Sequence, residues 1–134
     1  MDENITLSAS NPKELAEFIV KTLYSKKAHS IKLLYVSDKT VITDYFVICT
    51  GNSNTQIKAL ADELDFKTTE SGLPPKSIEG FREANWIVLD YSSVIVHIFS
   101  RDTREFYNLE KVWGDAEEID ITEFLPKEEA NENE

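Results

Sequence analysis

Hydrophobic residues recur along the chain at spacings that predict alternating helices and strands. The segment NPKE has the form of a helix start, in which Asn11 is the N-cap and Glu14 is the acid of a capping box. The next apolar residues share one helical stripe: Leu15, Phe18, Ile19 and Leu23. We therefore expect a helix that ends near Lys26 and Lys27, since positive charge favours a helix C-terminus.

The middle of the chain predicts two strands followed by a second helix. The apolar runs at 31–36 and 45–50 are short and rich in Val, Ile and aromatic residues, which is typical of strands. Ser53 and Gln56 then match the Ser-x-x-Gln form of a capping box. Apolar residues at helical spacing follow: Ile57, Leu60, Ala61 and Leu64. This helix is expected to close at Gly72, just before two prolines.

The remaining apolar segments complete the set of elements. They predict a short helix from about 103 to 113 and three strands, at 77–79, 86–91 and 94–99. The order of elements indicates an α/β or α+β fold with a mixed β-sheet flanked by helices. A parallel step is expected where the helix at 53–70 links two strands, because a crossover helix lets them run in the same direction.

The two-residue link Ser92-Ser93 fixes how the last two strands pair and defines two faces of the resulting hairpin. Strand alternation places only apolar residues on the first face, which we assign to the core: Ile87, Leu89, Tyr91, Val94, Val96 and Ile98. The second face is mixed: Trp86 beside Phe99, Val88 beside His97, and Asp90 beside Ile95. Two interpretations stay open. Either a helix covers this second face and His97 and Asp90 are satisfied locally, or part of the face is exposed as a docking patch.

Negative charge is concentrated at the C-terminal end. The 134 residues carry a formal net charge of −11, and residues 115–134 alone hold nine acidic residues and one lysine. The length suits one compact domain, so we assign residues 1–10 to a flexible N-terminus, 11–116 to the domain and 117–134 to an acidic tail. Binding to a phosphate backbone needs an excess of Lys and Arg, so little direct nucleic-acid binding is expected. A basic protein fits better as a partner.

Candidate sites for metals, cofactors or membranes are sparse. Cys49 is the only cysteine and lies within an apolar run, so we expect a buried, unreactive thiol. No cluster of Cys and His has metal-ligand spacing, and we expect neither a metal nor a cofactor. The first ten residues are acidic and polar, unlike a targeting peptide, and no apolar run approaches the ~20 residues of a membrane span. We therefore expect a cytoplasmic protein.

The sequence does not predict a catalytic site. The turn GNS at 51–53 opens a helix after a strand, where phosphate can bind, but a helix cap explains it fully. Nucleotidyl transfer would need two carboxylates on one face of a nearby strand, whereas Asp90 is alone on its strand. Acyl chemistry would need a nucleophile and an acid placed beside His97, and no motif places them there. Arg104 and Glu110 are most simply the surface of a short helix.

Several separated motifs resemble one known family. They are SDKT at 37–40, ITDYFVICTGNS at 42–53 with Gln56, IEG at 78–80, WIVLDY at 86–91, VHIF at 96–99, REFY at 104–107, LE at 109–110 and WGD at 113–115. In this order they are similar to the ribosomal silencing factor family, also termed Iojap-like, over roughly residues 12–116. The resemblance implies a nucleotidyltransferase-like fold that lacks the catalytic acids, in agreement with the single carboxylate of Asp90.

The resemblance also implies a function. Members of the family bind the large ribosomal subunit at its intersubunit face through its fourteenth protein, obstruct joining of the small subunit and repress translation when nutrients are short. Homodimers occur among free members, a monomer is expected on the ribosome, and organelle relatives act in ribosome assembly. We expect six residues to form the contact with the basic ribosomal protein: Asp38, Asp44, Trp86, Asp90, His97 and Phe99. The alternatives are an assembly factor that uses the same surface and a nucleotide-using transferase.

Overall fold

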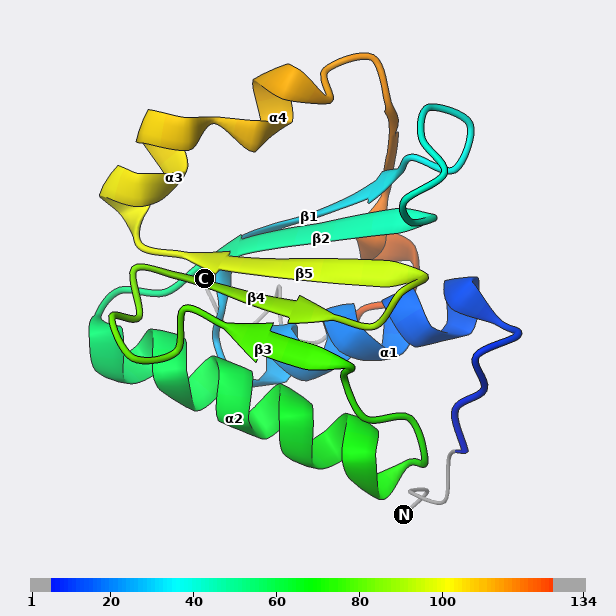
Figure 1. Ribbon diagram of the computed structural model, residues 1–134, viewed down its shortest axis with the longest axis horizontal. Coiled ribbons are helices and arrows are strands. Elements are labelled where there is room, and N and C mark those ends of the chain that lie inside the picture. The colour runs from blue at the N-terminus through cyan, green and yellow to red at the C-terminus, as the bar shows by residue number, and fades with distance from the viewer. Residues whose placement is uncertain (1–5, 127–134) are drawn as a thin grey trace.

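Six strands form one mixed sheet at the centre of the molecule in the computed structural model, which describes residues 6–126 (Figure 1). In sheet order they are β3 (Ser77–Glu79), β4 (Trp86–Asp90), β5 (Val94–Phe99), β2 (Tyr45–Thr50), β1 (His29–Tyr35) and β6 (Glu117–Ile119). The neighbours β2 and β5 are parallel, and the other neighbouring pairs are antiparallel. The helix α2 (Asn54–Glu70) leads from β2 to β3, and these two strands run in the same direction, as a crossover helix predicts.

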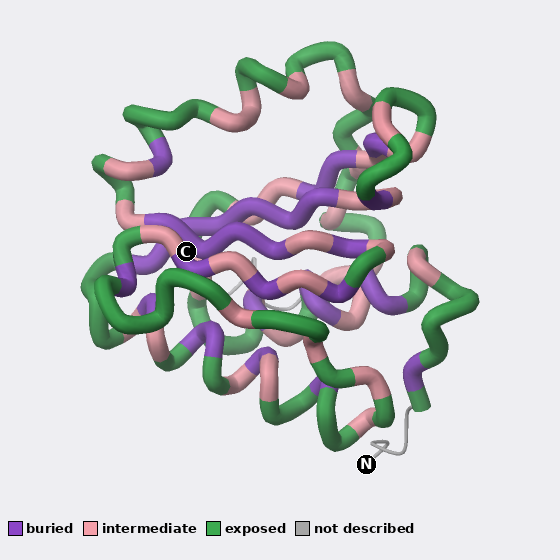
Figure 2. Tube along the Cα trace, in the orientation of Figure 1, coloured by how far each residue is buried: buried purple, intermediate pink, exposed green. Residues whose placement is uncertain are grey.

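Helices lie on both faces of this sheet. On one face lie α1 (Pro12–Ser25) and α2, while α3 (Arg101–Tyr107) and α4 (Leu109–Val112) arch over the other (Figure 1). Buried residues are concentrated in the central strands and on the sides of α1 and α2 that face the sheet (Figure 2). The predicted mixed sheet with flanking helices is therefore confirmed, as an α+β fold.

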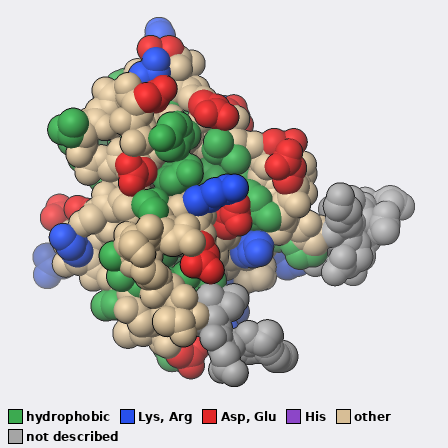
Figure 3. All heavy atoms as spheres, turned by 90° about the vertical axis from the view of Figure 1, so that its right-hand side faces the viewer, with side chains coloured by type: hydrophobic (Ala, Val, Ile, Leu, Met, Phe, Trp, Pro, Cys, Tyr) green, Lys and Arg blue, Asp and Glu red, His purple; other side chains and the backbone are tan. Residues whose placement is uncertain are grey.

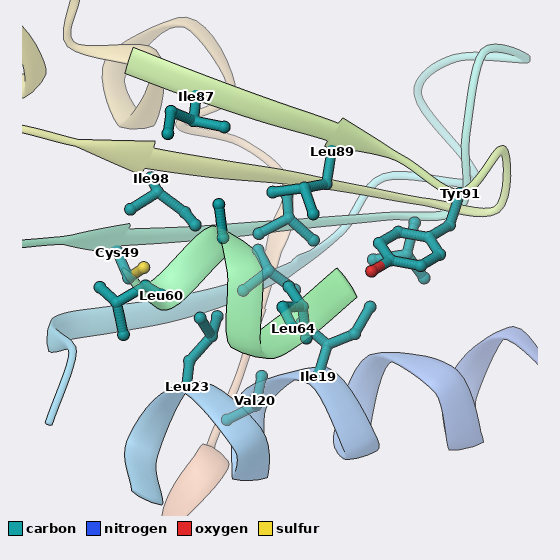
Figure 4. Close-up of a cluster of buried hydrophobic side chains, with 14 of the residues drawn as sticks. Ile19, Val20, Leu23, Cys49, Leu60, Leu64, Ile87, Leu89, Tyr91 and Ile98 are labelled. Atoms are coloured by element: carbon teal, nitrogen blue, oxygen red, sulfur yellow. The ribbon is translucent and has the colours of Figure 1, made fainter. Parts of the chain in front are cut away.

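The larger core lies between the sheet and the helices α1 and α2. Ile19 of α1 and Leu60 and Leu64 of α2 meet Leu89 and Ile98 of the hairpin there (Figure 4). All five of these side chains are at most 1% exposed. Their burial, together with the rest of the two apolar stripes, is what fixes both helices against the sheet.

Both long helices begin at their predicted caps. Asn11 Oδ1 accepts a hydrogen bond from the Glu14 N–H at 3.2 Å, and Ser53 Oγ accepts one from the Gln56 N–H at 3.0 Å. α2 ends at Glu70, before a glycine with a φ of 95°. Caps of this kind satisfy backbone donors that have no partner within the helix, which explains why the helix starts are readable from the sequence.

The hairpin pairs in the predicted register, with Trp86 opposite Phe99 and Asp90 opposite Ile95. Every residue of its first face is buried, as the apolar pattern predicts: Ile87, Leu89, Tyr91, Val94, Val96 and Ile98. The link adopts a tight turn in which Ser92 has a φ of 71°. The first face of the hairpin therefore belongs to the larger core, so only the second face is available to contact other elements or a partner.

The single helix predicted near 103–113 is wrong, because this segment forms two helices, α3 and α4. They are separated at Asn108, which adopts the left-handed conformation with a φ of 47°. Asn tolerates this conformation better than most residues. A residue in the left-handed conformation ends a helix because the backbone after it no longer follows the helical path. The apolar spacing continues across Asn108, so the pattern alone does not reveal the break.

The folded part of the chain extends beyond both predicted domain boundaries. The Leu7 N–H donates to the Ser71 carbonyl at 2.8 Å, and the Leu7 side chain is 5% exposed. At the other end, β6 pairs with β1, and three apolar residues pack against the larger core: Ile119, Ile121 and Phe124. The remaining ends of the segments predicted as flexible or acidic tails, 1–5 and 127–134, lie outside the described residues.

Two further properties follow from the described part of the chain. Cys49 is completely buried, and burial raises the pKa of its thiol to about 12, which makes it unreactive at neutral pH. Among residues 6–126, none of the helices combines the length and the apolar character that a bilayer crossing requires.

Candidate functional site

The second face of the hairpin, termed here the hairpin face, is covered over only part of its area. It consists of Trp86, Val88, Asp90, Ile95, His97 and Phe99. Phe99 is completely buried in a second core cluster that includes Leu109 of α4, and His97 is 8% exposed. The other four residues are half-buried. The α3–α4 segment therefore covers one end of this face, as the first interpretation expected, and leaves the β4 residues partly accessible; docking on that part stays a prediction.

Trp86 lies at the boundary between the covered and the accessible parts. The centroid of its ring is 5.0 Å from that of Phe99 and 4.7 Å from that of Tyr107 in α3. Tyr107 is itself 49% exposed, so the two rings together present aromatic surface to solvent. A large ring that is held in place yet accessible has the properties of an interface anchor.

His97 orients Trp86 through a hydrogen bond. The Trp86 Nε1–H donates to His97 Nδ1 at 3.0 Å, which places the proton of the neutral imidazole on Nε2. The described residues offer this buried Nε2 no partner. Burial lowers the pKa of His97 to about 4, so the ring is neutral at physiological pH. His97 is thus placed to position Trp86 rather than to exchange protons with a substrate.

Asp90 shapes the hairpin turn. Its Oδ1 accepts a hydrogen bond from the Ser92 N–H at 2.7 Å, which supports the left-handed conformation of Ser92. Within residues 6–126, no group of three or more His, Cys, Asp and Glu side chains is arranged to hold a metal ion. The other oxygen of this half-buried carboxylate has no hydrogen-bond partner among the described residues, so it can meet a cation from outside.

The loop at 37–44 brings two further carboxylates to the same end of the hairpin. The Val36 N–H donates to the Asp44 carbonyl at 2.8 Å, and the Asp44 N–H donates to the Ser93 carbonyl at 3.1 Å. These bonds fix the base of the loop beside the hairpin turn that Asp90 supports. Asp38 is exposed and Asp44 is half-buried. Asp44 therefore lies beside the turn end of the hairpin, and Asp38 lies in the same loop.

The six predicted contact residues form two groups instead of one cluster. Asp38, Asp44 and Asp90 lie at the turn end, whereas the other three lie at the α3 end: Trp86, His97 and Phe99. Trp86 and Asp90 are four positions apart on β4, which corresponds to about 13 Å along a strand. Phe99 cannot touch a partner directly because it is fully buried; it packs against Trp86 instead.

The structure adds residues that sequence reasoning missed. Tyr107 completes the aromatic surface beside Trp86, although the sequence places it only on a short helix. Val41 is 103% exposed and Ile42 is 69% exposed at the tip of the loop at 37–44. The available signal was a pair of β-branched residues inside an otherwise polar link between two strands.

Arg104 ties the covering segment to the sheet. Its Nη1 donates to the Ser30 carbonyl and to Thr50 Oγ1, both at 2.8 Å. Its Nε and Nη2 donate to Glu110 Oε2 at 3.0 and 2.8 Å. The expectation that Arg104 is a surface residue is wrong, since it is 9% exposed. Through this network α3 and α4 stay in place over Phe99 and beside Trp86.

The turn at 51–53 uses its polar groups internally. Ser53 Oγ caps α2, and the Asn52 N–H donates to Gln56 Oε1. A cavity of about 770 Å³ opens beside this turn and is lined by both basic and acidic side chains, among them Arg101, Arg104, Glu105 and Glu110. Arg104 is already engaged by Glu110. The helix cap thus accounts for this turn, as the sequence suggests.

Comparisons with known proteins agree with one another. The family model described as "Ribosomal silencing factor during starvation" matches residues 9–134. A ribosomal silencing factor from Bacillus subtilis is 40% identical over 111 residues, which cover 83% of this chain and 94% of that relative. A crystal structure of a Chromobacterium violaceum protein is similar with a TM-score of 0.74 at 30% identity, covering 76% of this chain and 85% of that one.

A more distant relative bears a name that refers to assembly. The mouse protein named "Mitochondrial assembly of ribosomal large subunit protein 1" is 32% identical over 100 residues, which cover 72% of this chain and 44% of that relative. The family match, the identity over most of the chain and the shared fold all point the same way. This chain belongs to the ribosomal silencing factor family.

Proposed function

We propose that this protein binds the large ribosomal subunit through its fourteenth protein, at the intersubunit face. Bound there, it blocks association with the small subunit and represses translation when nutrients are short. The observation that carries this proposal is the hairpin face itself: an accessible aromatic anchor at Trp86, with the carboxylates of Asp38, Asp44 and Asp90 at its other end. Family membership supports the choice of the ribosome as the target.

The charge of the chain supports a protein as the landing site. The formal net charge is −11, so ribosomal RNA repels the molecule as a whole. A basic ribosomal protein offers Lys and Arg to the three carboxylates and apolar surface to Trp86. An interface that buries about 800 Å² on each side is ordinary for such a complex. Because a second subunit cannot occupy the same space, blocking needs no chemical step and no cofactor.

Replacing the aromatic anchor tests this face directly. We expect Trp86→Ala to weaken binding to purified large subunits by about 30-fold, because a central aromatic anchor typically contributes about 2 kcal/mol. The measurement is co-sedimentation of the full chain with large subunits over a range of concentrations. Phe66→Ala is the matched control, since Phe66 is an aromatic residue 59% exposed on α2, on the opposite face of the sheet. Equal binding by Trp86→Ala and the wild type would reject the hairpin face.

A subunit-joining assay tests the consequence of binding. The two subunits are mixed at a magnesium concentration that permits joining, with and without the protein, and the joined peak is measured by sedimentation. Silencing predicts association with the large subunit alone and a smaller joined peak. Binding to neither subunit would contradict a ribosomal function.

Assembly of the large subunit is the second candidate, favoured by the name of the mouse relative. The same surface would then dock on immature subunits. Binding that leaves the joined peak unchanged, with a preference for immature over mature large subunits, would select this candidate. The two functions share one contact, so Trp86→Ala is expected to impair both.

Oligomeric state and location complete the proposal. The free protein forms a homodimer and binds the ribosome as a monomer, in the cytoplasm. Equilibrium sedimentation of the free chain, compared with the stoichiometry on large subunits, tests this change from dimer to monomer.

A nucleotide-using transferase is the remaining alternative, and binding of a nucleotide together with Mg²⁺ would be its signature.

A further inference from the structure

The tip of the loop at 37–44 exposes two adjacent aliphatic side chains. Val41 is 103% exposed and Ile42 is 69% exposed. Neither is among the six residues assigned to the contact from the sequence, and neither belongs to the two core clusters of the described residues. Hydration of two β-branched aliphatic side chains is unfavourable, and among the described Val and Ile residues only Val41, Ile42 and Val112 are exposed.

Hydrogen bonds within the loop support its base and its tip. At the base of the loop, the Val36 carbonyl accepts hydrogen bonds from the Lys39 N–H at 2.9 Å and the Thr40 N–H at 3.1 Å. Near the tip, the Ile42 N–H donates to Thr40 Oγ1 at 3.2 Å. Thr43, which follows, is 5% exposed and so anchors the returning strand. A preorganised loop loses little conformational entropy when it binds.

Carboxylates surround the base of the loop. Asp38 lies within it, Asp44 closes it, and Asp90 lies across from it at the hairpin turn. Lys39 is neutralised by Asp115, with Nζ and Oδ2 3.5 Å apart. Figure 3 faces this end of the molecule, where hydrophobic side chains gather near the centre, with acidic side chains around them and Lys or Arg side chains among them.

Tyr45 packs against the larger core, on the other face of the sheet from the hairpin face, but at the same end of the molecule as the loop. Burial contributes most to the raised pKa of Tyr45, followed by Tyr35 and then by the carboxylates of Asp44, Glu17 and Glu117. These carboxylates come from α1, the loop at 37–44 and β6, three segments far apart in the sequence. Their convergence makes this end of the molecule complementary to a basic surface.

We infer that Val41 and Ile42 form a second anchor, which inserts into an apolar depression bordered by Lys and Arg on a protein of the large ribosomal subunit. This inference rests on the proposed function and adds to it a two-point contact. Trp86 anchors one end of the hairpin face, and the loop tip anchors the other, beside the turn. Carboxylates near the two anchors pair with the Lys and Arg side chains that border the depression on the partner protein. They disfavour binding to a partner surface that is acidic or purely apolar.

The double variant Val41→Ser/Ile42→Ser tests the second anchor. We expect its affinity for purified large subunits to fall about tenfold or more, with an unchanged unfolding temperature because both side chains are exposed. The exchange variant Val41→Ile/Ile42→Val keeps the aliphatic surface and is expected to bind like the wild type. Phe66→Ser, on the opposite face, controls for the loss of exposed apolar surface alone. Unimpaired binding by the double-serine variant would overturn the inference.

A photocrosslink identifies what the tip touches. Val41→p-benzoylphenylalanine in the full chain is irradiated on purified large subunits, and the product is digested with nuclease or protease. A crosslink to a large-subunit protein supports the inference. A crosslink to ribosomal RNA, or to a second copy of the chain, overturns it.

The two proposals fail in distinguishable ways. If the wild-type protein does not co-sediment with large subunits, the proposed function is overturned. If the wild type binds and Trp86→Ala binds weakly while the double-serine variant binds normally, only the second anchor is overturned. Reduced binding by both variants supports both anchors.

Discussion

Arg104→Met is expected to lower the free energy of unfolding by about 3–5 kcal/mol, the usual loss when one partner of a buried ion pair is removed. The guanidinium is 9% exposed and donates to Ser30, Thr50 and Glu110, so the substitution leaves three acceptors without their donor. Burial alone would raise the pKa of Glu110, but the hydrogen bonds and charge of Arg104 hold it below its usual range. Urea titration at pH 7 measures the loss.

Two further variants show whether the network or the charge itself is responsible. Arg101→Met removes an exposed arginine from the same helix and is expected to change the free energy of unfolding by less than about 0.5 kcal/mol. The double variant Arg104→Met/Glu110→Leu no longer leaves an unpaired carboxylate, so it is expected to recover part of the loss. If Arg104→Met were as stable as the wild type, the network would not hold α3 and α4 on the sheet.

His97 makes the second large prediction, which concerns acid. Burial lowers its pKa in the folded state to about 4, below the ordinary value of 6.5 that it regains on unfolding. Between these two values the unfolded chain binds a proton that the folded chain excludes. The free energy of unfolding therefore falls as the pH is lowered from about 6.5 to about 4, and the contribution of His97 to this fall is about 3 kcal/mol.

Comparison with a variant isolates this contribution from that of the carboxylates. His97→Phe removes the titrating group, so its stability is expected to be flatter over the same pH range, even though it loses the hydrogen bond to Trp86. The chain contains only two histidines, and His29 is exposed, so His29→Gln is the matched control for the loss of a histidine. Equal slopes in the wild type and His97→Phe would contradict the exclusion of a proton from the folded state.

Local patterns were sufficient to predict most of the fold. The caps at Asn11 and Ser53 and the alternation in the hairpin each depend on residues within a few positions of one another, and all are confirmed. The register of the hairpin follows from the two-residue link Ser92-Ser93 alone. These predictions succeeded because the residues that decide each feature lie close together in the sequence.

Prediction failed where the deciding interaction joins residues far apart in the sequence, or where the structure depends on a single backbone angle. Arg104 is buried because it reaches Ser30 and Thr50, which are 74 and 54 residues away. The helix break at Asn108 depends on its left-handed conformation, which an otherwise helical pattern conceals. The candidate site followed the same division, since pairing on the hairpin was predicted, whereas coverage of its second face by a helix was only one of two interpretations left open.

The two outermost strands of the sheet have a consequence for self-association. β3 and β6 are each only three residues long, and their sequences, SIE and EEI, carry glutamates. Short, charged edge strands repel the backbone pairing through which sheets grow from one molecule to the next. Copies of this chain are therefore protected from fibrillar stacking, and contacts between them are restricted to side chains on the faces of the molecule. Glu118→Val, which removes one of these charges, is the kind of change that would expose the chain to aggregation.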